Sequence, residues 1–207
     1  MKPAAPRRPC VFFDRDGVVN QSPGPGYVNH LDDFHLLPGF ADCVRAAAEK
    51  GFPSVVVTNQ RGLSRGLTPP EQLDAMHRHL QGELAREGLS LLDILVCPAD
   101  DDAHPDRKPN PGMLRTAARR HRLDLSTSWM VGDRESDVKT GQNAGVAATV
   151  LVDPGDAPTA ADFRVPDMPA CAALLREKLR APGVLRSGGV KHQVHESSAC
   201  KASAGVR

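Results

Sequence analysis

The stretch that decides the fold is Val11-Phe12-Phe13-Asp14-Arg15-Asp16-Gly17. Its apolar half is typical of a short buried strand, and its second half ends in two acids and a glycine that permits a sharp turn. Asp14 and Asp16 are two residues apart, so on an extended backbone both side chains leave the strand end in the same direction. Two carboxylates held so close repel each other unless a cation lies between them, which indicates a Mg²⁺ site. A turn with two solvated acids explains these residues equally well if they are taken alone.

Length and composition indicate one globular domain. Of the 207 residues, 40% are hydrophobic, 25% are charged and 4% are aromatic, and the net charge is +1. We expect a single folded domain at residues 9–180, with disordered tails at residues 1–8 and 182–207. No basic stripe with interleaved aromatics and no membrane-length apolar run is present, so neither a nucleic-acid nor a membrane partner is expected. We expect a monomer.

The cysteines indicate a reducing compartment. They are five in number and scattered, with no C-x-x-C pair. The N-terminus also lacks the hydrophobic segment of a secretory signal. We therefore expect free thiols and a cytoplasmic protein.

Strand patterns alternate with helix patterns along the chain, which predicts a Rossmann-like, doubly wound parallel sheet with helices on both faces. The long loop at residues 18–37 carries Pro and Gly at its tip, and loops of this length are often functional. Thr68-Pro69-Pro70-Glu71 has the pattern of a helix capping box. The predicted strands cover about residues 11–13, 53–58, 92–97, 129–131 and 147–152, and the predicted helices cover about 39–50, 68–84, 111–122, a segment ending near 143, and 171–180.

Polar residues follow four of these predicted strands. In an open parallel sheet, ligands lie at the carboxyl ends of the strands, so residues distant in sequence meet there. These residues are Asp14 and Asp16, Thr58, Lys108 in the loop after the third strand, and Asp133 with Asp137.

This ordered set resembles the haloacid dehalogenase superfamily of phosphohydrolases. The matching features are D-x-D-G at residues 14–17, Thr58 after a Val-rich strand, Lys108, and G-D-x-x-x-D at residues 132–137. The resemblance covers about residues 9–180. It implies a phosphomonoester hydrolase that uses Mg²⁺ and a phospho-aspartyl intermediate. The intervals between the motifs leave no room for an inserted lid domain, so a capless member is expected.

Carried over by position, the resemblance assigns catalytic roles to the acids. Asp14 would be the nucleophile, and Asp16 would protonate the leaving oxygen and then activate water. Mg²⁺ would be held by the side chains of Asp14 and Asp133 and by the backbone carbonyl of Asp16. Asp137 would orient the metal shell or Lys108, although an acid in the first turn of a helix is also favoured by the helix dipole alone.

The remaining catalytic and binding residues follow in the same way. Thr58 and Asn59 can donate hydrogen bonds to phosphate oxygens, and Lys108 adds positive charge against the transition state. The finer pattern resembles D-glycero-D-manno-heptose 1,7-bisphosphate phosphatases and the related histidinol-phosphate phosphatases, and it extends the substrate-binding set to Tyr27, Asn59, Gln60, Arg61 and Arg107. Arg107 could equally be a surface arginine that balances the acids at residues 100–102.

One departure from that group concerns zinc. Its members usually carry C-x-H and C-x-C just before the Arg-Lys-Pro, whereas this chain offers Cys97, His104 and Asp106 in a shorter loop. Zinc is therefore not expected, because four well-placed ligands are not evident. The expected activity is that of a heptose 1,7-bisphosphate 7-phosphatase in carbohydrate metabolism. The alternatives are a histidinol-phosphate or other small sugar or polyol phosphate phosphatase, and a non-enzymatic phosphoryl-binding protein.

Overall fold

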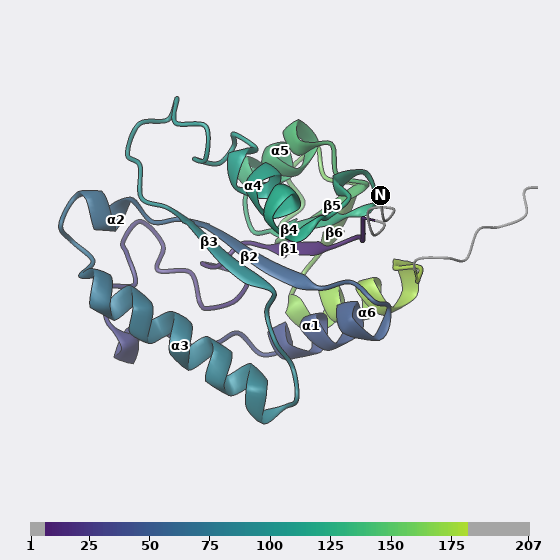
Figure 1. Ribbon diagram of the computed structural model, residues 1–207, viewed down its shortest axis with the longest axis horizontal. Coiled ribbons are helices and arrows are strands. Elements are labelled where there is room, and N and C mark those ends of the chain that lie inside the picture. Colours follow the sequence, from purple (N-terminus) through teal and green to yellow (C-terminus); the bar gives the residue numbers. More distant parts are fainter. Residues whose placement is uncertain (1–6, 182–207) are drawn as a thin grey trace, which may run out of the picture.

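A parallel sheet of six strands, in the order β3-β2-β1-β4-β5-β6, forms the centre of the protein (Figure 1). The structure is a computed structural model that describes residues 7–181. From β1 the chain builds β2 and β3 on one side and then crosses to β4, β5 and β6 on the other. The strand order therefore reverses between β1 and β4, where open sheets of this kind bind ligands. The strands are β1 Val11–Phe13, β2 Ser54–Asn59, β3 Asp93–Cys97, β4 Trp129–Gly132, β5 Ala148–Val152 and β6 Phe163–Val165.

Helices cover both faces of the sheet, which confirms the predicted doubly wound architecture. One face carries α1 (Phe40–Glu49), α3 (Pro70–Arg86) and α6 (Met168–Lys178), and the other carries α4 (Gly112–His121) and α5 (Glu135–Ala144) (Figure 1). The strand residues alternate between two buried clusters, because successive side chains of a strand point to opposite faces. Phe13 packs in the cluster under α1, α3 and α6, and Phe12 packs in the cluster under α4.

Several short elements differ from the prediction. β6 was not expected, because three residues are too few to show the alternating hydrophobic pattern of a strand. Phe163 of β6 stacks on Trp129 of β4, with ring centroids 5.4 Å apart, and this contact stabilises the strand. A short helix, α2 (Arg61–Ser64), replaces part of the expected loop after β2. The 3-10 turns Leu31–Asp33 and Leu125–Thr127 complete the described elements.

The predicted capping box at residue 68 is wrong. α3 begins at Pro70, Pro69 is its extended N-cap, and no side chain caps it. A residue that precedes proline is pushed out of the helical region, so Pro70 keeps Pro69 extended and the helix cannot begin earlier. Thr68 is buried, and its hydroxyl donates instead to Asn29 Oδ1 at 2.8 Å.

The folded part of the chain includes Arg8, one residue before the predicted domain boundary. Arg8 N donates to the carbonyl of Arg122 at 3.2 Å, and Asp124 N donates to the carbonyl of Arg8 at 2.8 Å. The rest of the expected tails, residues 1–6 and 182–207, lies outside the described residues. Cysteines 10, 43, 97 and 171 are free and buried. None of the helices within residues 7–181 has the length and apolarity of a membrane span.

Candidate active site

The end of β1 is built so that the chain passes close to β4. Asp14 N donates to the carbonyl of Val131 at 2.9 Å, which holds Asp14 at the end of the sheet. Gly17 follows with φ of +93°, and a Cβ at this position would lie 2.1 Å from Asp133 Oδ2. The glycine of the opening stretch is therefore required both by the turn and by the approach to Asp133.

Three carboxylates converge at this point. Asp14, Asp133 and Asp137 each offer an oxygen, and these oxygens lie within 4.8 Å of one another. Burial and the Asp137 carboxylate raise the pKa of Asp14 to about 8, against the charge of Lys108. Burial and Asp137 also raise the pKa of Asp133 to about 6, and Asp133 Oδ1 is buried without a hydrogen-bond partner. The cluster is short of positive charge and offers hard oxygen ligands, so it fits a divalent cation.

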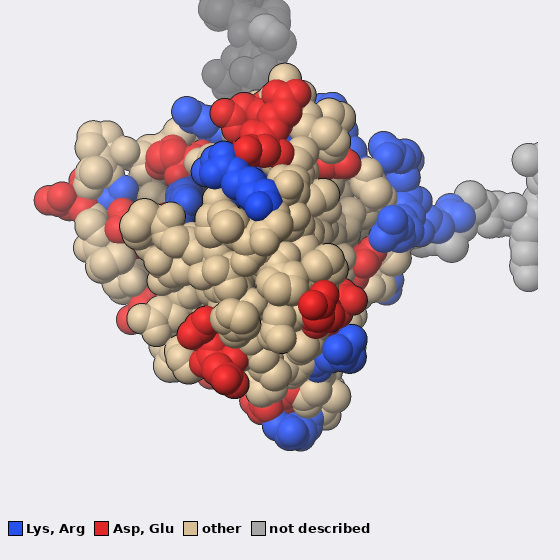
Figure 2. Space-filling model, turned by 90° about the vertical axis from the view of Figure 1, so that its left-hand side faces the viewer, with Lys and Arg blue, Asp and Glu red and all other residues tan. Residues whose placement is uncertain are grey.

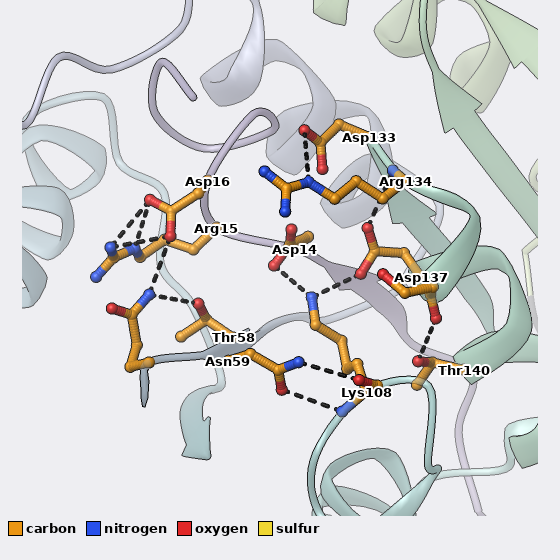
Figure 3. Close-up of polar contacts among 12 residues, drawn as sticks. Asp14, Arg15, Asp16, Thr58, Asn59, Lys108, Asp133, Arg134, Asp137 and Thr140 are labelled. Carbon is orange, nitrogen blue, oxygen red and sulfur yellow. Dashed lines mark hydrogen bonds and ion pairs between the residues drawn. The ribbon is translucent and has the colours of Figure 1, made fainter. Parts of the chain in front are cut away.

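The predicted metal ligands are the side chains of Asp14 and Asp133 and the backbone carbonyl of Asp16, and this set stays a prediction. The carboxylate cluster contains the first two side chains and adds that of Asp137, while the side chain of Asp16 points elsewhere (Figure 3). Gly132 makes room for Asp137, because a Cβ at residue 132 would lie 2.1 Å from Asp137 Cβ.

Lys108 is the cation of the cluster. Its Nζ donates to Asp14 Oδ1 at 2.5 Å and to Asp137 Oδ1 at 2.6 Å, and the three side chains are buried (Figure 3). Burial acts to lower the pKa of Lys108, but the two carboxylates outweigh it, so the pKa is raised and the side chain stays charged. Both readings of Asp137 find support in the structure, because it contacts Lys108 and its Oδ2 also accepts the N–H of Arg134 at 3.2 Å at the start of α5.

Asn59 holds Lys108 from the backbone side. Its Nδ2 donates to the carbonyl of Lys108 at 3.1 Å, and its Oδ1 accepts the N–H of Lys108 at 3.0 Å (Figure 3). Asn59 thus links β2 to the Lys108 loop, and it also lines the cavity, so its expected contact with phosphate stays a prediction. The sequence contains no signal for this link.

Asp16 is held on the other side of Asp14. Its carboxylate accepts hydrogen bonds from Arg15 (Figure 3). It also accepts hydrogen bonds from the side-chain amides of Asn20 and Gln60. Gln60 Nε2 also donates to Thr58 Oγ1 at 2.8 Å, which leaves the Thr58 hydroxyl proton free to donate. Gln60 was expected to contact the substrate, and the structure places its amide between Asp16 and Thr58. Arg15 and Asn20 were not expected in the site.

A cavity of about 230 Å³ opens above these groups. Its walls include the loop at residues 23–28, which contains Tyr27, and the residues from Thr58 to Arg61. Arg107, Lys108 and Arg134 also line it. The loops after β2 and β3 lie at the left in Figure 1, and Figure 2 views the molecule from that side, where acidic and basic side chains lie next to one another. The cavity thus combines the carboxylates of Asp14, Asp16 and Asp137 with several cations.

The arginines of the cavity differ in how many hydrogen bonds their side chains already make to other protein groups. Arg107 Nε donates to Asp102 at 2.7 Å and Nη1 donates to the carbonyl of Ala99 at 3.0 Å, so part of Arg107 serves the neighbouring loop. The side chain of Arg134 is 58% exposed and 3.8 Å from Asp133, and in Figure 3 its guanidinium lies between Asp133 and Asp14.

The rim of the cavity is tied together by surface contacts. Arg65 donates two hydrogen bonds of 2.8 Å to Asp100, and its Nη1 lies 3.4 Å from the Tyr27 hydroxyl. Arg61 lies 3.5 Å from the same Asp100. Tyr27 is thus linked to the loops after β2 and β3.

The loop at residues 98–110 is ordered by hydrogen bonds. His104 Nδ1 accepts the N–H of Asp106 at 3.2 Å and lies 3.8 Å from Cys97 Sγ. Asn110 Nδ2 donates to the carbonyls of Asp102 and His104, each at 3.0 Å. The expectation on zinc remains a prediction.

Comparisons with known proteins identify the family. The HAD-hydrolase-like family model matches residues 106–173, which contain Lys108, Asp133 and Asp137. The chain is 37% identical over 160 residues to D-glycero-alpha-D-manno-heptose-1,7-bisphosphate 7-phosphatase of Burkholderia mallei, covering 72% of this chain and 82% of that protein. It is also 37% identical over 164 residues to D-glycero-beta-D-manno-heptose-1,7-bisphosphate 7-phosphatase of Yersinia pestis, covering 73% and 84%. The chain belongs to the HAD-like hydrolases.

A solved structure agrees with this assignment. The D,D-heptose 1,7-bisphosphate phosphatase from B. bronchiseptica, complexed with magnesium and phosphate, aligns with a TM-score of 0.72 and 34% identity. The alignment covers 81% of this chain and 97% of that chain. This HAD-like hydrolase is therefore a phosphatase, and the predicted resemblance and enzyme class are confirmed.

Proposed function

We propose that this HAD-like phosphatase is Mg²⁺-dependent, works through a phospho-aspartyl intermediate on Asp14, and removes the 7-phosphate of a D-glycero-D-manno-heptose 1,7-bisphosphate. The observation that carries the proposal is the position of Asp14. It is buried, lines the cavity, lies 2.5 Å from the Lys108 ammonium, and is grouped with the carboxylates of Asp133 and Asp137.

In the first step, a carboxylate oxygen of Asp14 forms a bond to phosphorus. The ester P–O bond breaks, its electron pair stays on the leaving oxygen, and Asp16 supplies the proton that this oxygen takes up. In the second step, Asp16 removes a proton from water as the water attacks phosphorus, and the bond to Asp14 breaks with release of phosphate. Asp14 and Asp16 return to their starting states, so atoms and charges balance.

Other groups of the site stabilise charge during these steps. Mg²⁺ held by Asp14 and Asp133, with the backbone carbonyl of Asp16, would offset the repulsion between the carboxylate and the phosphate. Lys108 adds a fixed positive charge, and the Thr58 hydroxyl is free to donate to a phosphate oxygen. Asp137 keeps Lys108 directed at Asp14.

The cations of the cavity favour a substrate with a second anionic group. Arg61, Arg107 and Arg134 line the cavity in addition to Lys108. A second phosphate would find positive partners there, whereas the amine of histidinol phosphate would be repelled. Relatives named for both the alpha and the beta anomer match this chain equally well, so both anomers are candidate substrates.

Two further expectations accompany the proposal. The free, buried thiols suit a reducing cytoplasm. We expect a monomer acting on a small metabolite, without nucleic-acid or membrane partners. A purely phosphoryl-binding role would leave the catalytic acids without use, and the measurement below separates it from catalysis.

The test is phosphate release from a panel of esters. The panel contains both anomers of heptose 1,7-bisphosphate, histidinol phosphate and simple sugar phosphates, each with Mg²⁺ and with EDTA. We expect the bisphosphate to be preferred, activity to be lost with EDTA, and the preference to shrink in an Arg107→Ala variant. Equal rates for all esters would contradict the heptose assignment, and an Asp14→Asn variant with full activity would contradict the intermediate.

A further inference from the structure

We infer that Arg15, between the two acids of the opening stretch, is a positioning residue that fixes the carboxylate of Asp16 for proton transfer. The inference rests on the proposed role of Asp16 and extends it to a residue outside the expected site. Arg15 does not line the cavity, and it acts on the substrate only through Asp16.

The contact between the two side chains is a fork, in which two guanidinium nitrogens of Arg15 donate to the two carboxylate oxygens of Asp16. Arg15 Nε donates to Asp16 Oδ1 at 3.1 Å, and Nη2 donates to Oδ1 at 2.9 Å and to Oδ2 at 3.0 Å. Arg15 is fully buried, whereas 21% of the Asp16 side chain is exposed and lines the cavity. A buried arginine fork fixes the plane of a carboxylate, which a single hydrogen bond does not.

The backbone around Arg15 is folded to complete the same carboxylate. The carbonyl of Arg15 accepts the N–H groups of Val18, Val19 and Asn20 at 3.3, 2.8 and 3.0 Å. This turn brings Asn20 Nδ2 to 2.9 Å from Asp16 Oδ1. Arg15 thus holds Asp16 directly through its side chain and indirectly through the turn.

The two oxygens of Asp16 are left with different capacities. Oδ1 accepts from Arg15 and Asn20, through three N–H groups. Oδ2 accepts from Arg15 and from Gln60 Nε2, the latter at 3.0 Å. Oδ1 therefore accepts three N–H groups, more than its roughly two lone-pair sites, whereas Oδ2 accepts two, and we assign the transferred proton to Oδ2, the less crowded oxygen. Gln60 also contacts Thr58, so this oxygen is held in register with the phosphate-binding hydroxyl.

Phe34 and His77, which lie beside Arg15 in the described structure, offer its guanidinium neither a hydrogen bond nor a charge that would compete with Asp16. Arg15 Nη1 and His77 Nε2 are buried without hydrogen-bond partners, and the Phe34 ring centroid lies 5.8 Å from the guanidinium carbon. Burial and the charge of Arg15 lower the pKa of His77 to about 4, so this histidine is neutral at assay pH. Within the described residues, the Arg15 side chain therefore donates its hydrogen bonds to Asp16 alone.

The test compares esters with different leaving groups. This comparison distinguishes a misplaced general acid from a general loss of structure or activity. Release of p-nitrophenolate needs little protonation, whereas release of a sugar alkoxide needs a general acid, which typically contributes about 10²–10⁴-fold. Asp16 is also the proposed base of the second step, which is the same for every ester, so the rates compared are those of the first step, measured as release of the leaving group in a single turnover. We expect Arg15→Met to lower this rate for the sugar phosphate by about 10²-fold. We expect the change for p-nitrophenyl phosphate to be less than about tenfold and KM to stay within about threefold, because the ground-state phosphate contacts remain.

Three further variants complete the experiment. Asp16→Asn should show the same leaving-group selectivity, and adding Arg15→Met to it should cause no further loss, because both changes act on one group. Arg15→Lys keeps the charge without the fork and should recover part of the activity; it also replaces Arg15→Met if the latter does not fold. Ser128→Ala is the structural control. Its buried hydroxyl bonds Cys10 N at 3.0 Å and the Asp124 carbonyl at 2.6 Å at the opposite end of β4.

Ser128→Ala should lower the melting temperature and leave the ratio of the two rates unchanged. A fall of both rates by the same factor in Arg15→Met, or losses that add to those of Asp16→Asn, would overturn the positioning role. An Asp16→Asn variant without leaving-group selectivity would overturn the proposed role of Asp16 and the inference with it, so the two failures are distinguishable.

Discussion

Replacing Lys108 by methionine is expected to destabilise the protein strongly, in a manner that depends on pH and Mg²⁺. The change removes the cation that Asp14 and Asp137 share at 2.5 and 2.6 Å. All three side chains are buried, so water cannot replace the lost charge. Removing one partner of a buried ion pair costs about 3–5 kcal/mol. In a domain of this size each kcal/mol corresponds to about 2–4 °C, so the melting temperature should fall by about 6–20 °C.

The pH dependence follows from the sign of the pKa shifts. The raised pKa of Lys108 means that its stabilising charge is fully present below its unfolded pKa of about 10.4, so it is constant between pH 5 and 9. The pKa of Asp14 is raised to about 8 with Lys108 in place and should rise further without it. A carboxyl with a raised folded pKa destabilises the folded state increasingly as pH rises from about 4 towards that pKa. The deficit of the variant should therefore be larger at pH 9 than at pH 5.

The assay is thermal unfolding at pH 5 and pH 9, with and without Mg²⁺. Bound Mg²⁺ would supply part of the missing charge, so the difference between the variant and the parent should narrow when it is added. Lys139→Met is the matched control, because Lys139 is exposed on α5 and its loss should change the melting temperature by no more than about 2 °C. A Lys108→Met variant with the same melting temperature as the parent at pH 9 without Mg²⁺ would refute the reasoning.

Three further predictions follow from the same site. Saturating Mg²⁺, at about 100 times its Kd, should stabilise the protein by about 2.7 kcal/mol, or about 5–10 °C in calorimetry. At one fixed Mg²⁺ concentration the gain should be larger at pH 8 than at pH 5, because Asp133 and Asp14, with pKa values raised to about 6 and about 8, must lose protons to bind Mg²⁺. A gain that persists in Asp133→Asn would contradict the site. Asn59→Ala should lower kcat by about 10–100-fold in steady-state assays, since it removes two hydrogen bonds that hold the Lys108 backbone; an unchanged kcat would mean that Lys108 is positioned without them. Gly17→Ala should weaken Mg²⁺ binding in calorimetric titrations, because its Cβ would lie 2.1 Å from Asp133 Oδ2. An unchanged affinity would show that the loop can move away from Asp133 without disturbing the site.

The sequence predicts well whatever depends on the ends of strands. The alternating pattern determines a parallel sheet, and the sheet then determines that Asp14, Thr58 and Asp133 meet at one edge. Their convergence therefore follows from topology without knowledge of any loop, whereas their expected catalytic roles come from the family resemblance and remain proposals.

The sequence predicts poorly whatever depends on the direction of side chains in loops. Asn59 and Gln60 are polar residues beside a phosphate site, and the expectation was that they contact the substrate. Both line the cavity, and that expectation stays a prediction; what the sequence did not show is that their amides also bond Lys108 and Asp16, because the loops bring those partners within reach. Arg15 was overlooked for a related reason, since no sequence pattern distinguishes an arginine folded back on its neighbour from one in solvent. β6 was overlooked because its three residues carry no measurable periodicity.

The end of β2 has a consequence for how this enzyme can be altered. Thr58, Asn59 and Gln60 are consecutive, and each has a different part in the proposed site: Thr58 offers its hydroxyl to the phosphate, Asn59 bonds Lys108, and Gln60 bonds Asp16. The backbone sets their spacing at about 3.3 Å per residue, so an insertion or deletion here would misplace all three functions at once. The exposed tip at residues 24–26 borders the same cavity and carries none of these bonds. Length changes that alter substrate choice while sparing the chemistry should therefore be tolerated at the tip and rejected at the strand end.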